Sequence, residues 1–318
     1  MKKFLAMLLA LVMVLGLCAC GQSASSQPAA EDKQEETSEA AAEAAAETTE
    51  ADDGADDFYL EIKFSNVFNP KEWNYKASEK LAQEITEKTD GHITVTYYGT
   101  NELDCYADSV TQAVNGANWM GLEEPSLFAD YVGDAAMVIA PMLYATNEEY
   151  NYVMDSEFVA NLIEELKESN IHILDTHYSF GFRSVCSNLD VYTPEDLHGH
   201  QFRATSSALF AKTLECLGAT PVVMGFTDCL AAIQQGVVEG FEGSVSTLAG
   251  AGEPYELVKK VASTNHLIAT RWLFMPEDVW QTIPEKYQKI ISDCAYECGM
   301  WEQTSCQDDE APQIEMLK

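Results

Sequence analysis

Positive charge, and arginine above all, is scarce in this 318-residue sequence. The chain has 18 Lys and Arg residues against 52 Asp and Glu residues, which gives a formal net charge of −34. Its only arginines are Arg183, Arg203 and Arg271. Such an acidic chain is repelled by nucleic-acid phosphates and by anionic lipid surfaces, so we expect neither as a partner. An anionic small molecule would have to be attracted locally, by one or more of the few cations.

Long apolar runs are also absent after the first twenty residues, so no later segment is expected to span a membrane. Lys2 and Lys3 precede the apolar residues 4–17, which is the pattern of a secretory signal peptide. The run ends Leu17-Cys18-Ala19-Cys20-Gly21, which resembles a bacterial lipobox. We therefore predict a lipoprotein signal peptide over residues 1–20 and lipidation of Cys20, and hence an extracytoplasmic, membrane-anchored protein. A plain cleaved signal peptide is the alternative.

Residues 21–57 lack large apolar side chains almost entirely and cannot form a core. They hold twelve acidic residues and a single basic one, Lys33. This composition predicts an acidic, low-complexity tether, with the folded part over residues 58–318.

Signatures of enzymes and metal sites are missing. The sequence has no Gly-x-Ser-x-Gly elbow, no phosphate-binding loop and no histidine cluster with metal-ligand spacing. His198 and His200 flank a glycine beside Glu195 and Asp196, and we interpret this segment as a surface turn. Seven cysteines follow Cys20, an odd number without regular spacing, so we expect buried thiols and no disulfide framework. We predict no cofactor, no metal and no catalysis; an extracytoplasmic enzyme remains an alternative.

The hydrophobic pattern alternates between strands and helices. Alternation over 60–64 and 93–97 predicts strands, and Trp73, Ala77, Leu81 and Ile85 recur every four residues as in an amphipathic helix. Strand, helix and strand in this order predict a parallel pair with a crossover. Further strands are predicted over 136–139, 171–176, 201–204 and 220–223, and further helices from Asn147, over 206–217 and 227–235, and from Pro284 to the end. The pattern predicts two α/β lobes with a ligand cleft between them.

All three arginines lie in or beside apolar, strand-like runs. A guanidinium group there needs an anionic partner, and its planar fork matches a carboxylate. The partner can be a ligand or an acidic residue of the chain. For Arg203 we leave both interpretations open, and for Arg271 an internal ion pair is favoured.

The surrounding motifs resemble a known family. Residues 181–184 (GFRS) and 192–203 (YTPEDLHGHQFR), followed by 217–226 (LGATPVVMGF) and 231–242 (AAIQQGVVEGFE), are similar to the solute receptors of tripartite ATP-independent periplasmic (TRAP) transporters of the DctP type. Residues 87–95 and 141–144 fit the same pattern, and the similarity runs from about residue 60 to about 301.

This resemblance implies a two-lobed fold of the type II periplasmic-binding-protein, or Venus flytrap, class, with hinge-crossing strands and a long C-terminal helix. Lobe 1 is expected over about 58–175 plus part of 265–318, and lobe 2 over about 176–264. Arg203 would bridge a ligand carboxylate and Arg183 would add a second contact. The other expected ligand-binding residues are Tyr178, Glu242, Gly243, Asn66, Val67, Glu123, Glu124 and Trp73, the last with core packing as its favoured role.

The sequence departs from the family pattern at three places. Gly243 stands where the family commonly has asparagine, Ala204-Thr205 replaces a Val-Pro pair, and the chain ends at Lys318 within a helical run, earlier than expected, which suggests truncation. The resemblance implies a receptor that captures a small organic acid and delivers it to TRAP permease subunits in the membrane. A receptor that reports its ligand to a membrane signalling protein is the alternative.

Overall fold

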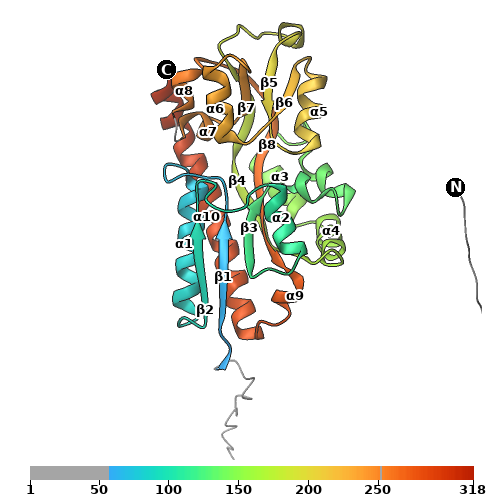
Figure 1. Cartoon of the computed structure of the whole chain (residues 1–318), viewed down its shortest axis with the longest axis vertical. Helices are drawn as coiled ribbons and strands as arrows, with labels where there is room; N and C mark the ends of the chain where they lie inside the picture. The colour runs from blue at the N-terminus through green and yellow to red at the C-terminus, as the bar shows by residue number, and fades with distance from the viewer. Residues whose placement is uncertain (1–56, 251–252) are drawn as a thin grey trace, which may run out of the picture. The chain divides into compact units, whose positions relative to one another are not determined.

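The computed structural model describes residues 57–250 and 253–318. Within them, eight strands form one sheet in the order β2-β1-β3-β8-β4-β7-β5-β6 (Figure 1). The predicted signal peptide, Cys20 and all of the predicted tether except Asp57 lie outside the described residues.

The strands are β1 (Leu60–Ser65), β2 (Ile93–Tyr98), β3 (Trp119–Glu123), β4 (Ile171–Ser187), β5 (Gln201–Ala204), β6 (Thr220–Val223), β7 (Gly240–Gly243) and β8 (Lys260–Pro276). The α-helices are α1 (Trp73–Lys88), α2 (Ala107–Val114), α3 (Asn147–Met154), α4 (Glu157–Lys167), α5 (Ala208–Cys216), α6 (Phe226–Gln234), α7 (Val245–Ala249), α8 (Pro254–Leu257), α9 (Glu277–Trp280) and α10 (Glu285–Leu317). Three 3₁₀-helices, η2 (Pro125–Phe128), η3 (Gly133–Ile139) and η4 (Pro194–Leu197), lie in the connections.

The predicted crossover near the start of the folded part is confirmed. Strands β1 and β2 pair in parallel, and α1 connects them. The apolar stripe of α1 is buried, with Ala77, Leu81 and Ile85 each fully inaccessible. Burial of such a stripe stabilises an amphipathic helix on a sheet more than its intrinsic helix propensity does.

Strands β4 and β8 connect the two halves of the sheet. Each is 17 residues long, and they pair antiparallel with several register shifts. Irregularities of this kind bend a strand and increase its twist. Strands β1–β3 lie on one side of this pair and β5–β7 on the other, each half with its own buried apolar clusters. The two-lobed α/β fold with hinge-crossing strands is thus confirmed, while the residue boundaries of the lobes stay a prediction.

The long C-terminal helix is also confirmed, because α10 runs for 33 residues and packs on β4 and α1. Gly299 lies at a close contact between the helix and β4. A Cβ atom at this position would come within 2.4 Å of an Asp175 carboxylate oxygen. The glycine therefore permits the close contact between helix and sheet.

Several sequence predictions were wrong in detail. Residues 136–139 belong to the 3₁₀-helix η3, since a short apolar run does not by itself distinguish a strand from a buried helical turn. The helix expected from Asn147 is two helices, α3 and α4. Thr146, not Asn147, caps the first by accepting the backbone N–H of Glu149, and Ser156 caps the second. The strand expected over 171–176 continues to Ser187.

Candidate ligand-binding site

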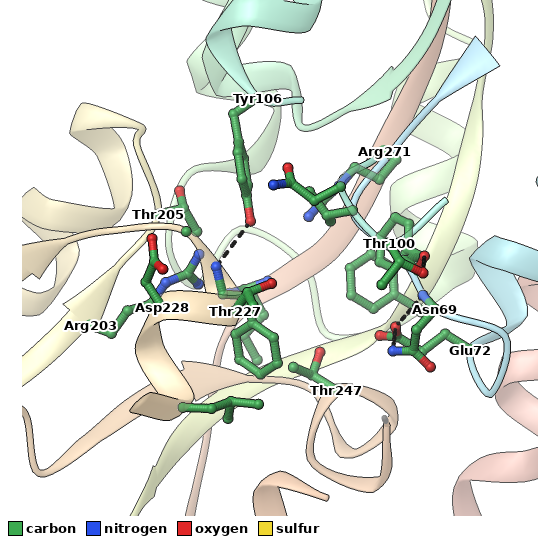
Figure 2. Close-up of a pocket in the computed structure, with 18 residues that line it drawn as sticks. Asn69, Glu72, Thr100, Tyr106, Arg203, Thr205, Thr227, Asp228, Thr247 and Arg271 are labelled. Atoms are coloured by element: carbon green, nitrogen blue, oxygen red, sulfur yellow. Dashed lines mark hydrogen bonds between the residues drawn. The ribbon is translucent and has the colours of Figure 1, made fainter. Parts of the chain in front are cut away.

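A cavity of about 500 Å³ lies between the two halves of the sheet (Figure 2). Its walls come mainly from loops that follow the carboxyl ends of β1, β2, β5 and β6, where α/β sheets commonly bind ligands. The lining residues are Val67, Phe68, Asn69, Glu72, Thr100, Asn101, Tyr106, Phe180, Arg183, Arg203, Thr205, Gly225, Phe226, Thr227, Asp228, Leu230, Thr247 and Arg271. All three arginines of the chain therefore face one cavity.

Arg203 lies on β5 with only 3% of its surface exposed. Its Nε–H donates to the Met224 carbonyl at 2.9 Å, and its guanidinium carbon lies 5.6 Å from the centre of the Phe226 ring. These contacts hold the head group in place at the cavity wall, and its two terminal nitrogens make no hydrogen bond to the described residues. Within residues 57–250 and 253–318, no carboxylate lies within ion-pair distance of Arg203.

Arg183 also lines the cavity, but its charge is balanced. It donates to both carboxylate oxygens of Glu242 and, at 2.9 Å, to the Glu242 carbonyl. Burial by itself would raise the pKa of Glu242, but the charge and hydrogen bonds of Arg183, together with nearby His266 (Nε2 to Oε2 3.7 Å), lower this pKa to about 2. The pair therefore stays ionised at neutral pH.

For Arg271, on β8, the sequence favoured an internal ion pair. Arg271 lines the cavity, and its Nη1 lies 3.6 Å from a carboxylate oxygen of Glu124. The same nitrogen donates to the Thr270 carbonyl at 2.7 Å, and the guanidinium packs over the rings of Phe68 and Phe180.

Of the remaining residues predicted from the resemblance, only Val67 lines the cavity. Asn66 is buried behind it and accepts a hydrogen bond from the Tyr97 hydroxyl. Tyr178 is buried against α10, and Trp73 packs edge-on against Trp301. The other four predicted residues lie outside the lining: Glu123, Glu124, Glu242 and Gly243.

Sequence reasoning missed most of the polar lining. Asn69 and Glu72 follow β1, Thr100 and Asn101 follow β2, and Thr227 and Asp228 follow β6. Their place after successive parallel strands was the available signal, because the carboxyl ends of such strands meet at one edge of a sheet.

Glu72 is the acidic residue on the wall opposite Arg203 (Figure 2). Its Oε2 accepts the backbone N–H of Asn69 at 3.0 Å and also the side-chain amide of Asn69. Burial raises the pKa of Glu72 to about 7, although the Asn69 hydrogen bonds and the charge of Arg271 act in the opposite direction.

Two hydrogen bonds join the walls of the cavity. The Thr205 hydroxyl donates to Glu124 Oε1 at 2.7 Å, and the Phe226 N–H donates to the Tyr106 hydroxyl at 3.3 Å. In each bond one partner belongs to the β1–β3 half and the other to the β5–β7 half. These bonds hold the two halves closed over the cavity.

The described residues contain no cluster of three or more side chains suited to a metal ion, and none of their helices is long and apolar enough to span a membrane. Their seven cysteines are free thiols. Six are buried as predicted, but Cys216, at the end of α5, is exposed.

Residues 64–318 match the family described as bacterial extracellular solute-binding protein, family 7, named DctP. The chain belongs to this family. Its architecture is therefore that of an extracytoplasmic solute receptor of the TRAP type, and the relatives give no support to the alternative of a sensory receptor. A TRAP periplasmic solute-binding protein from Desulfovibrio salexigens, in complex with diglycerolphosphate, is 34% identical, with a TM-score of 0.80 over 82% of this chain and 84% of that one.

Two other relatives align with similar fractions of this chain. A TRAP solute-binding protein from Fusobacterium nucleatum with bound sn-glycerol-3-phosphate is 29% identical, with a TM-score of 0.80 over 81% of this DctP-family chain and 83% of that one. The C4-dicarboxylate-binding periplasmic protein DctP of Rhodobacter capsulatus is 27% identical over 71% of this chain and 67% of its own.

Proposed function

We propose that this receptor captures a small organic anion, a carboxylate as the sequence predicts or a phosphate ester, in the cavity between its lobes. The observation that carries the proposal is Arg203, a buried guanidinium that faces the cavity and has no ion-pair partner among the described residues. The relatives support it, since their names specify dicarboxylates and phosphate esters. Arg203 would donate to the anion through its terminal nitrogens.

Closure over the ligand produces the form that membrane permease subunits of a TRAP transporter recognise. Contacts made only in the closed form, such as the bond from Thr205 to Glu124, shift the population toward it once a ligand is bound. The receptor itself performs no chemical step. A lipid on Cys20 keeps it beside the permease at high effective concentration.

Replacement of Arg203 tests the proposal. A thermal-shift screen with carboxylates and phosphate esters identifies a ligand, and calorimetry then compares the native protein with the Arg203→Ala variant. We expect affinity to fall at least about thirtyfold, because loss of one partner of a buried charge pair costs ~2–5 kcal/mol. Lys212→Ala is the control, since Lys212 is an exposed cation of the same half, paired with Glu215. Unchanged affinity in a folded Arg203→Ala protein would refute the assignment.

The lipid anchor is tested separately. Cells that express the full chain incorporate a labelled fatty acid into it, and Cys20→Ala abolishes this incorporation and releases the protein from the membrane. Membrane retention of an unlabelled Cys20→Ala protein would show that another segment anchors the chain.

A further inference from the structure

The cavity contains three arginines but only one unbalanced cation. Arg183 is neutralised by Glu242, and Arg271 lies 3.6 Å from Glu124. The charge of Arg271 also acts to lower the pKa values of two more acids of the β1–β3 half, the partly buried Glu72 and the buried Glu123. Among the described residues, Arg203 is the cavity arginine without a carboxylate at ion-pair distance. The site can therefore neutralise one anionic group of a ligand, and this group belongs at Arg203.

The opposite wall is polar, and the cation that acts on it, Arg271, is shared among the acids Glu72, Glu123 and Glu124. Asn69, Glu72, Thr100 and Asn101 line it, and Figure 2 shows the three of them that are labelled, Asn69, Glu72 and Thr100, gathered on the side away from Arg203. Glu72 uses Oε2 to hold Asn69, while its Oε1 has no hydrogen-bond partner in the described part of the chain. A free carboxylate oxygen at a cavity wall is an acceptor for a ligand hydroxyl.

A second anionic group on the ligand would meet this wall unfavourably. Two carboxylates at close range disfavour each other's ionised forms, and this repulsion grows as water is excluded. Burial already raises the pKa of Glu72 to about 7, so the wall tolerates added negative charge poorly. A hydroxyl group in the same place donates to Glu72 and accepts from the amide groups or the threonine hydroxyl.

We propose that the ligand is a polyhydroxylated monoacid, with its one anionic group at Arg203 and a hydroxyl-bearing chain that donates to Glu72, and that Glu72 rejects a diacid of the same length. This inference rests on the proposed function and narrows its substrate class. A cavity of about 500 Å³ has room for a chain of several hydroxylated carbons. The anionic group can be a carboxylate or a phosphate ester, since both accept from a guanidinium fork.

Two matched pairs of compounds test the inference by calorimetry on the full-length protein. Galactonate and galactarate differ only in a terminal hydroxymethyl group that becomes a carboxylate, and glycerol 3-phosphate and 3-phosphoglycerate differ in the same way. We expect the hydroxymethyl member of at least one pair to bind, and to bind at least tenfold more tightly than its diacid partner. The pair that binds identifies the anionic group as carboxylate or phosphate.

The role of Glu72 is tested with Glu72→Gln, which keeps the shape and an acceptor oxygen but removes the charge. We expect this variant to bind the diacid more tightly than the native protein does. The preference for the monoacid over the diacid should therefore fall at least threefold. Glu253→Gln is the matched control, because Glu253 is an exposed acid that pairs with Lys71 outside the cavity. It should leave the preference unchanged.

Three results would overturn the inference: a diacid that binds as tightly as its monoacid, failure of both monoacids to bind, or an equal change of preference in the two glutamine variants. A diacid that binds tightly and still depends on Arg203 would leave the proposed function intact. If the Arg203→Ala variant bound the monoacid with unchanged affinity, the proposed function would be refuted instead. Failure of the inference and failure of the proposed function are therefore distinguishable.

Discussion

Arg183 and Glu242 form a buried ion pair between the neighbouring strands β4 and β7, beside the cavity. The guanidinium group is 4% exposed and the carboxylate 1%. Its position beside the site resembles that of a ligand-binding arginine, yet its two-pronged bond is already made within the chain. The pair fixes the strand that leads from the hinge into the second half of the sheet, and its contribution to stability can be measured.

We predict that Glu242→Leu lowers the free energy of unfolding by about 3–5 kcal/mol, because it leaves the Arg183 charge buried without a partner. The double variant Arg183→Met/Glu242→Leu should recover most of this loss, since it removes both charges. Urea denaturation of the single and double variants measures the difference. A single variant that loses less than about 1 kcal/mol would mean that Arg183 finds water or another partner.

The bond from Thr205 to Glu124 is predicted to favour closure. Thr205→Val removes a donor to a buried carboxylate, and hydrogen bonds to charged groups contribute ~1.5–3 kcal/mol, so affinity should fall about tenfold or more. The loss should be the same factor for every ligand, because the bond belongs to the closed form. Calorimetry with two ligands of different affinity checks this.

Thr205→Ser serves as the control for that experiment, since it keeps the hydroxyl group and should bind almost as the native protein does. Small-angle scattering of the ligand-free Thr205→Val protein should show a larger radius of gyration. A loss confined to one ligand would instead indicate direct contact between Thr205 and that ligand.

Stability should decrease as pH rises from about 4.5 to 7, in part because of Glu302. This residue of α10 is fully buried and accepts the Ser179 N–H at 2.9 Å. Burial raises its pKa from 4.5 to about 7 despite the hydrogen bonds it accepts from Cys306 and Ser179. Between these values the native state binds more protons than the unfolded state, so its contribution is fully present below pH 4.5 and is lost as pH rises through 7.

We predict that Glu302→Gln removes this slope, which amounts to roughly 3 kcal/mol at ~1.4 kcal/mol per pKa unit. Melting temperatures between pH 4.5 and 8 measure it for the native protein and the variant. Glu315→Gln, at an exposed position of the same helix, is the control and should keep the native slope. An unchanged slope in Glu302→Gln would assign the pH dependence to other buried acids, such as Glu123.

The sequence predicted those features that depend on residues close together along the chain. The stripe of Ala77, Leu81 and Ile85 predicted a helix, and it packs as expected because the 3.6-residue period brings these positions to one face. The motif around Arg203 indicated the family and identified this residue as a candidate ligand-binding cation from the sequence alone. It did so because arginine in an apolar strand requires an anionic partner wherever it is found.

By itself, then, the sequence determined the family, the α/β class and the three candidate cations. Only the tertiary structure decided which of these cations is unbalanced. Arg183 pairs with Glu242 across 59 residues of chain, and Arg203 has no carboxylate within ion-pair distance among the described residues. The same holds for Glu72, whose position opposite Arg203 depends on two loops brought together by the sheet. Whether a charge is balanced depends on its distance in space from other charges. Spacing along the chain does not specify such distances where strands from different halves of the sheet meet at one cavity.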